Sequence, residues 1–324
     1  MKNRSDLLTP EFRALSARLG SDPLQVQGPG GNTSIKDGEV MWIKASGTEL
    51  ANAETQDIFV AVDRNAAKAE ASGYGDGSCK QTVLDPAITL RPSIETTFHA
   101  ALDYTVVAHT HSVATLVHVV GPEGRAQAVK KLAGLPFVMV PYAKPGLPLT
   151  REILSRVTPD TKVILLQNHG LICCGDTVDD VSNLIREVEM RLAMAERSHQ
   201  DKPPNKPAPE GFAWAYGGWV AKDEWAMMHA KAGSYYPDHV VFLGPALPSL
   251  DEGRWPAVLH EGTGIALRVE ATPSQRAMLR CLSDILARLP CDWTLEPIGL
   301  DAEAELLNWD AEKYRQSLAA SALA

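Results

Sequence analysis

A proline-rich segment divides the chain into two parts. Residues 201–211 read DKPPNKPAPEG and contain four prolines. Proline lacks a backbone N–H and fixes φ, so this segment excludes a regular helix and favours an extended conformation. We therefore predict a linker over residues 201–210, with a larger domain of residues 1–200 before it and a smaller extension of residues 211–324 after it.

The composition is typical of a globular protein and argues against two classes of partner. Of the 324 residues, 45% are hydrophobic and 22% are charged. The net charge of −9 disfavours non-specific binding to nucleic acid or to an anionic membrane. No apolar run approaches the ~18 residues that cross a bilayer, and the N-terminal residues lack the apolar stretch of a secretory signal. The five cysteines match no zinc-binding spacing and indicate core thiols in a cytoplasmic protein.

Short apolar runs alternate with amphipathic stretches in both parts, which predicts an α/β fold. Two threonine–proline pairs, at Thr9 and Thr272, are typical of helix starts, and the second belongs to a capping box. The expected strands are residues 40–44, 106–112, 137–142, 162–167, 239–243 and 264–269. The expected helices are residues 7–19, 93–102, 114–120, 177–199 and 273–289.

Three histidines have the context of a metal site. His109 and His111 are two residues apart on an expected strand, so both side chains point to the same face. His169 follows another expected strand and precedes a glycine. Three imidazoles leave a coordination position open, which is the catalytic pattern for zinc. The alternative is that each ring is a hydrogen-bonded core histidine.

Glu95 lies in the first turn of an expected helix, where its carboxylate can reach the same metal or a substrate proton. An acidic residue in a first helical turn also stabilises the helix dipole, and that alternative stays open.

Two glycine-rich loops, GPGGNTS at residues 28–34 and KASGT at residues 44–48, offer backbone N–H groups and hydroxyls to a small anion. The first loop lacks the lysine of a P-loop, and Thr33 replaces the third glycine of a dinucleotide-binding motif. A phosphate or carboxylate site therefore remains, with a turn-rich hairpin as the alternative.

Five motifs in order resemble the class II aldolase/adducin family: GGNTS, KASG, RPSxE, HTHS and NHGL. The resemblance covers about residues 10–198 and implies a three-layer fold, with a mostly antiparallel central sheet flanked by helices, plus a small C-terminal α/β extension. It is nearest to the N-terminal aldolase part of bifunctional rhamnulose-phosphate aldolase/dehydrogenase proteins. Those proteins share the segments YPDHVVFLG (residues 236–244) and NWDAEKY (residues 308–314).

The resemblance implies a role for each site residue and makes residues 1–200 a metal-binding catalytic domain. His109, His111 and His169 are expected to bind a divalent metal, zinc or alternatively manganese, and Glu95 is expected to act as general base. The substrate is expected to be a ketose 1-phosphate, similar to rhamnulose or fuculose phosphate, cleaved through a metal-stabilised enediolate. A homo-oligomer, namely a tetramer, is implied as well. The residues expected to contact the phosphate are Asn32, Ser46, Gly47 and Ser93.

Two departures from the family pattern leave alternatives open. Ile94 stands where many members have a second phosphate-binding serine, and Arg91 is a candidate replacement. The proton-donating tyrosine of family aldolases has no clear counterpart among Tyr142, Tyr235 and Tyr236. The alternative functions are decarboxylation or 4-epimerisation of a sugar phosphate at the same metal, or a non-catalytic adducin-like module. The complete ligand set favours an enzyme, because a structural module has no use for it.

Overall fold

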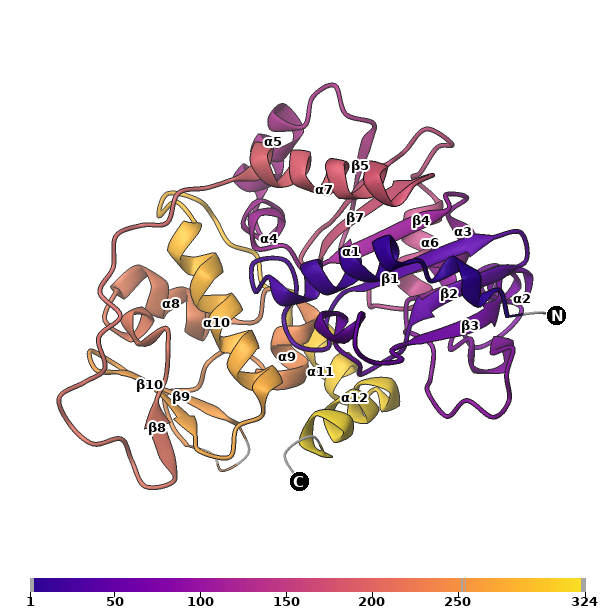
Figure 1. Cartoon of the computed structure of the whole chain (residues 1–324). Helices are drawn as coiled ribbons and strands as arrows, with labels where there is room; N and C mark the ends of the chain where they lie inside the picture. The colour runs from indigo at the N-terminus through magenta and orange to yellow at the C-terminus, as the bar shows by residue number, and fades with distance from the viewer. Residues whose placement is uncertain (1–2, 252, 254, 322–324) are drawn as a thin grey trace.

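The computed structural model describes residues 3–251, 253 and 255–321, and its first part is built on one seven-stranded sheet (Figure 1). The strand order is β3-β2-β1-β4-β7-β6-β5, and all neighbours are antiparallel except β5 and β6. The predicted mostly antiparallel sheet is confirmed. The strands are β1 Asn32–Asp37, β2 Val40–Lys44, β3 Phe59–Asp63, β4 Val106–Thr110, β5 Phe137–Val140, β6 Val163–Leu166 and β7 Gly170–Gly175.

Helices cover both faces of this sheet, which makes three layers. Successive side chains of β4 point to opposite faces of the sheet and so enter two different hydrophobic cores. Val106 and Ala108 pack toward α1, α4 and α7, and Val107 packs toward α3 and α6. His109 has the same parity as Val107 and therefore faces the α3 side, where its ring meets the edge of Phe98. The helices of this part are α1 Pro10–Ser21, α2 Arg64–Ala71, α3 Thr96–Ala101, α4 Val113–Val119, α5 Pro122–Lys131, α6 Leu147–Leu154 and α7 Val178–Leu192.

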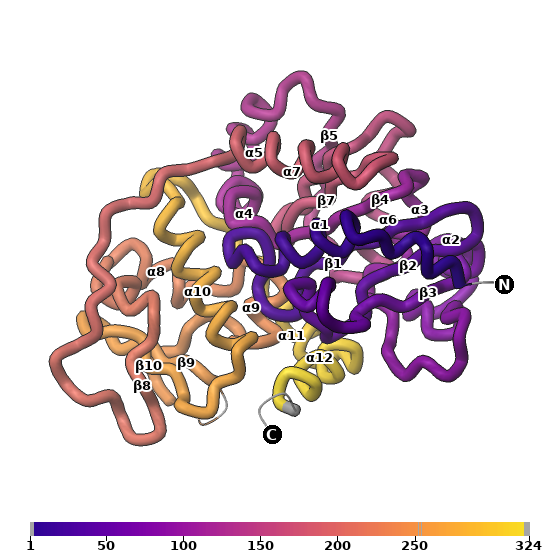
Figure 2. The backbone as a smooth tube through the Cα atoms, in the orientation of Figure 1, coloured from indigo at the N-terminus to yellow at the C-terminus, as the bar shows by residue number. Residues whose placement is uncertain are grey.

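The extension is a second α/β unit that packs against the first part. Figure 2 traces the chain out of α7 through residues 193–211, which contain neither helix nor strand, into a three-stranded sheet of order β8-β10-β9. Helix α10 packs on α4, and one hydrophobic core includes residues of both parts. The proposed domain boundary at residues 201–210 stays a prediction. The elements are β8 Phe212–Trp214, α8 Glu224–Ala232, α9 Pro237–Leu243, β9 Ala257–His260, β10 Gly264–Arg268, α10 Pro273–Arg288, α11 Leu300–Leu307 and α12 Asp310–Ser321.

Ten of the eleven expected helices and strands are present, and three corrections apply; β1, β3 and β7 are among the elements that were not predicted. The expected strand at residues 239–243 belongs to helix α9, which begins at Pro237. All residues of this helix are buried, so its sequence lacks the alternation of polar and apolar residues that distinguishes a helix from a strand. Helix α3 begins at Thr96 rather than at Ser93, because the Ser93 N–H donates to the Lys44 carbonyl and ties this segment to β2. Helix α7 ends at residue 192, earlier than expected.

Two further expectations concern thiols and membranes. Four of the five cysteines are buried as expected, whereas Cys291 is exposed. Within residues 3–251, 253 and 255–321, none of the helices is both long and apolar enough to cross a bilayer.

A buried lysine on β1 should make stability depend on pH. Burial lowers the pKa of Lys36 from 10.5 to about 7, and its Nζ donates to the His99 carbonyl at 2.6 Å. Between these pH values the unfolded chain binds a proton that the native chain lacks, so this group makes the unfolding free energy rise with pH. The slope is at most about 1.4 kcal/mol per pH unit. In urea titrations from pH 7 to 10, Lys36→Met should remove that slope.

The exposed Lys130→Met on α5 is the matched control and should follow the wild type. Parallel stability curves for wild type and Lys36→Met would show that Lys36 stays protonated in the native state across this range.

Candidate metal centre

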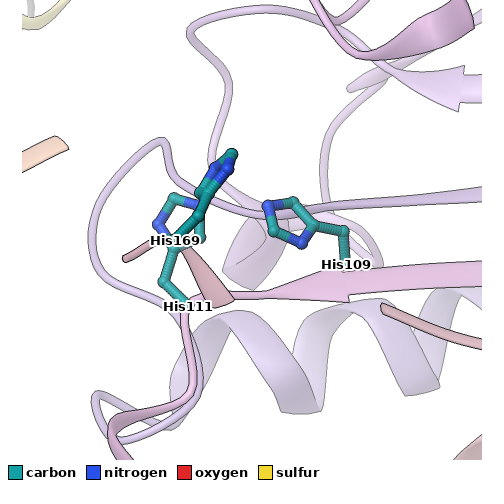
Figure 3. A group of neighbouring side chains, drawn as sticks. All are labelled: His109, His111 and His169. Carbon is teal, nitrogen blue, oxygen red and sulfur yellow. The ribbon is translucent and has the colours of Figure 1, made fainter. Parts of the chain in front are cut away.

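Three histidines gather where strands β4 and β7 meet (Figure 3). His109 lies on β4, His111 follows the end of that strand, and His169 directly precedes β7. In the antiparallel register Thr110 pairs with Leu171, so the end of one strand adjoins the start of the other. Nitrogen atoms of the three buried rings lie within 4.8 Å of one another. The fold therefore brings the three predicted ligands to one point.

The loop that carries His169 is held tightly on both sides. A Cβ on Gly170 would lie 2.2 Å from a backbone carbonyl oxygen of β4, so only glycine permits this approach of the two strands. Asn168 adopts a left-handed φ of 53°, and its side-chain amide donates to the carbonyls of Tyr235 and Glu296. Backbone of the extension thus helps to position this ligand.

Glu95 lies between two of the imidazole rings. Its Oε2 is 3.5 Å from Nε2 of His109, and its Oε1 is 3.6 Å from Nε2 of His169. Nδ1 of His109 lies 3.0 Å from the Leu171 carbonyl oxygen, which places the proton on Nδ1 and leaves the Nε2 lone pair free. The carboxylate is buried, at 4% exposure for the residue. Glu95 and the ring nitrogens therefore share one small desolvated space.

A chain of polar side chains sets the orientation of Glu95. Asn32 lies opposite His109 in the register of β1 and β4 and donates Nδ2 to Glu95 Oε2 at 2.8 Å. Asn32 Oδ1 lies 2.5 Å from His99 Nε2, and His99 Nδ1 lies 2.7 Å from the Ser34 hydroxyl. Burial lowers the pKa of His99, so the ring is neutral, and a proton on Nε2 satisfies both contacts. This chain holds Glu95 by Oε2 and leaves Oε1 available.

The unpaired buried atoms of the cluster fit a divalent cation. Among the described residues, Glu95 Oε1 and His109 Nε2 are buried without a hydrogen-bond partner. Such an atom costs about 1–3 kcal/mol unless something else satisfies it. Burial lowers the pKa of His109 and of His169, so both rings are neutral, which is the metal-binding form. Three imidazoles with one open side have the donor chemistry of catalytic zinc, and Glu95 would lie beside the ion.

A small cavity beside the histidines contains the four residues predicted to contact phosphate. Asn32, Ser46, Gly47 and Ser93 line it together with the buried Lys44. The amide hydrogens of Asn32 are directed to Ser93 and Glu95, so in this state Asn32 positions the carboxylate. The cavity volume is about 30 Å³. This is enough for water or an ion but far below the volume of a sugar-phosphate site. The phosphate contacts stay predictions.

Helix α12 closes the cavity over the KASG loop. Gly47 has a φ of +80°, and a Cβ there would lie 2.4 Å from Leu318 Cδ1, so the helix lies directly on this glycine. Arg315 of α12 lines the metal cavity itself. Next to it, Tyr314 stacks on Arg91 at 3.8 Å, and both line an adjoining cavity of about 410 Å³. Arg91, the candidate replacement for the missing serine, thus lies beside the site rather than in it.

Two charged residues of the extension reach the centre and were missed from the sequence. Asp238 of α9 lines the cavity, with Oδ2 3.4 Å from Nδ1 of His111. Arg315 donates to both oxygens of Asp238, at 2.8 and 3.0 Å. Burial opposes ionisation of Asp238, but the charge of Arg315 outweighs it and lowers the pKa of Asp238. No sequence spacing links Asp238 or Arg315 to the histidines. The one sequence signal for them was their position in the two segments shared with the bifunctional proteins: Asp238 lies within YPDHVVFLG, and Arg315 directly follows NWDAEKY.

The candidate proton donors lie away from the cavity. Neither Tyr142, Tyr235 nor Tyr236 lines it. The hydroxyls of Tyr235 and Tyr236 donate to backbone carbonyls within the extension. Burial raises the pKa of all three phenols. A single chain in this state therefore brings none of these tyrosines to the metal centre.

The known proteins that resemble this chain identify its family. Residues 14–195, more than half of the chain, match the Class II Aldolase and Adducin N-terminal domain. The chain belongs to the class II aldolase/adducin family. The predicted family is thereby confirmed, and the narrower resemblance to bifunctional aldolase/dehydrogenase proteins stays a prediction.

Relatives in the class II aldolase/adducin family carry different descriptions. An uncharacterized oxidoreductase, YuxG of Bacillus subtilis, is 32% identical over 197 residues, which are 54% of this chain but only 28% of that protein. L-fuculose phosphate aldolase of Haemophilus influenzae is 29% identical over 172 residues, 51% of this chain and 71% of the aldolase. A 3-oxo-tetronate 4-phosphate decarboxylase of Escherichia coli is 28% identical over 114 residues, 31% of this chain and 52% of the decarboxylase.

A solved structure shares the fold of the first part. The N-terminal class II aldolase domain of a conserved protein from Thermoplasma acidophilum is 30% identical and superposes with a TM-score of 0.50. The superposition covers 59% of this chain and 97% of that domain. The family match ends at residue 195, so the extension and Asp238 lie beyond the matched residues.

Proposed function

We propose that this chain is a metal-dependent carbon–carbon lyase that cleaves a ketose 1-phosphate similar to fuculose or rhamnulose phosphate. The observation that carries the proposal is the unpaired Oε1 of Glu95 beside three buried histidines. The family and its L-fuculose phosphate aldolase relatives support it. A module without chemistry would have no reason to bury this set of unpaired groups.

Each residue has a part in the proposed reaction. His109, His111 and His169 would hold zinc, or alternatively manganese, which supplies a Lewis acid for a carbonyl and its neighbouring hydroxyl. Glu95 would take the proton with Oε1, while Asn32 keeps Oε2 in place. Desolvation around the carboxylate limits competing reactions with water.

The phosphate would lie on the KASG side of the cavity. Ser46 and Ser93 offer hydroxyl donors there, Gly47 offers its backbone N–H, and the buried guanidinium of Arg315 lines the same cavity. A phosphate dianion is recognised by such a combination of donors and charge. The expected homo-oligomer and the cytoplasmic location stay predictions.

Hydrogen exchange without cleavage tests the reaction class. The purified metal-loaded protein is incubated in heavy water with dihydroxyacetone phosphate and no aldehyde, and deuterium at the carbon bearing the free hydroxyl is followed by NMR. A class II aldolase should exchange this position, and removal of the metal with a chelator should stop the exchange. A metal-loaded protein that catalyses no exchange would contradict the aldolase proposal.

Decarboxylation is the second candidate, favoured by the match to 3-oxo-tetronate 4-phosphate decarboxylases. Loss of carbon dioxide from a 3-oxo acid also develops negative charge next to a carbonyl, so the same centre suits it. Release of carbon dioxide from 3-oxo-tetronate 4-phosphate, together with no exchange into dihydroxyacetone phosphate, would favour this candidate.

A further inference from the structure

Two sequence segments that the proposed reaction does not use meet at the metal centre. YPDHVVFLG contributes Asp238 on α9, and Arg315 directly follows NWDAEKY on α12. The two side chains are 2% and 7% exposed. A pair of opposite charges this deeply buried needs a partner or a task, because desolvation alone makes it unfavourable.

The contacts fix the Asp238 carboxylate in one plane. Arg315 Nη1 donates to Oδ1 at 2.8 Å, and Nη2 donates to Oδ2 at 3.0 Å, which is the two-point geometry of an arginine–carboxylate pair. Glu312 accepts from the same Nη1 at 2.9 Å. The guanidinium is therefore locked by two carboxylates, and Asp238 cannot rotate freely toward or away from the histidines.

The fixed carboxylate faces His111, a ligand whose Nδ1 has no other partner among the described residues. Asp238 Oδ2 lies 3.4 Å from His111 Nδ1, which forms no hydrogen bond among the described residues. His109 has its Nδ1 proton placed by a backbone carbonyl. At His111 the Asp238 carboxylate takes the place beside Nδ1 that the Leu171 carbonyl has at His109.

An imidazole binds a metal through one nitrogen when the other carries the proton. A carboxylate beside Nδ1 favours a proton there, leaves the Nε2 lone pair for the ion, and keeps the ring in orientation. Loss of such a partner typically weakens metal binding by about 10–100-fold.

We propose that Asp238, held by Arg315, is the positioning residue of His111, so that the extension completes the metal centre of the family domain. The proposal rests on the metal centre proposed above. It assigns the extension a direct part in metal binding, although Asp238 lies outside the residues that match the family.

Zinc affinity of the full chain tests the proposal. The metal-free protein is titrated with zinc against a chromophoric chelator, and cobalt is titrated separately to record its visible absorption. Asp238→Asn keeps the shape but loses the charge, and it should weaken zinc binding at least about 10-fold. The cobalt absorption should change as well, because His111 is no longer held in one orientation.

The matched control is Asp284→Asn on α10, which alters another buried aspartate paired with an arginine. Asp284 is 4% exposed and lies 3.3 Å from Nη1 of Arg288. This variant should keep the wild-type zinc affinity even if it lowers the thermal midpoint. Should Asp238→Asn not fold, Arg315→Lys replaces it, because lysine keeps the charge but not the two-point contact.

The outcomes separate this proposal from the proposed function. A folded Asp238→Asn, or Arg315→Lys in its place, that binds zinc within about twofold of the wild type overturns the positioning role and leaves the metal centre intact. A weakening shared equally by Asp284→Asn also overturns it, because the effect is then general loss of stability. A wild-type chain that binds no zinc or cobalt overturns the metal centre itself.

Discussion

Glu95→Gln lowers the metal-dependent exchange of deuterium into dihydroxyacetone phosphate by about 10²-fold or more. Glutamine keeps the length of the side chain and an oxygen that can accept from Asn32, which now donates to Oε2 at 2.8 Å. It replaces the other oxygen, the unpaired Oε1, by an amide that has no basic lone pair. The variant should therefore retain metal and fold while losing proton transfer, as measured by NMR.

Glu70→Gln is the control for this prediction. Glu70 of α2 is also buried, at 8% exposure, and accepts from the Cys79 N–H at 3.0 Å; it does not line the metal cavity. Its replacement by glutamine should leave the exchange rate unchanged. Undiminished exchange by Glu95→Gln would disprove the role of Glu95 as base and leave the aldolase proposal in place.

His109→Ala should lose the bound metal. The wild type is expected to hold about one divalent ion per chain after dialysis, and the alanine variant less than a tenth of that. His109 is fully buried, and its free Nε2 has no other partner among the described residues, so no neighbouring group substitutes for it. His111→Ala and His169→Ala should behave alike. Elemental analysis by mass spectrometry gives the stoichiometry.

His118→Gln on α4 is a matched control, because His118 is fully buried and its Nδ1 lies 2.8 Å from the Ala114 carbonyl oxygen. The His118→Gln variant should bind as much metal as the wild type. Unchanged stoichiometry in all three ligand variants would place the metal elsewhere in the chain.

The ligand set could be predicted because its signals are local. An expected strand over residues 106–112 predicted that His109 and His111 share a face, and a glycine after His169 marks a sharp approach of two strands. In the structure β4 ends at Thr110, and His111 follows directly after it. The structure brings all three together, as the pattern indicated. The local signals alone left core histidines as the alternative, and the family resemblance joined His169 to the other two, because β4 and β7 are distant in the sequence.

The contribution of the extension could not be predicted in the same way. Asp238 directly precedes the apolar run of residues 239–243, which indicated a strand, and the structure places it with that run in helix α9. Its contact with His111 depends on how α9 and α12 pack against the ends of β4 and β7. Such a packing is set by the summed contacts of many side chains, and no spacing in the sequence records it.

The position of α12 has a consequence for any measured affinity. Leu318 lies on Gly47, and the remaining cavity has a volume of only about 30 Å³. The sugar phosphate proposed as substrate would therefore bind only the fraction of molecules in which Leu318 has moved off Gly47. The apparent dissociation constant equals the intrinsic constant divided by that fraction. Leu318→Ala, which removes this contact but leaves Arg315 in place to hold Asp238, should thus tighten apparent substrate binding without adding a single contact to the substrate.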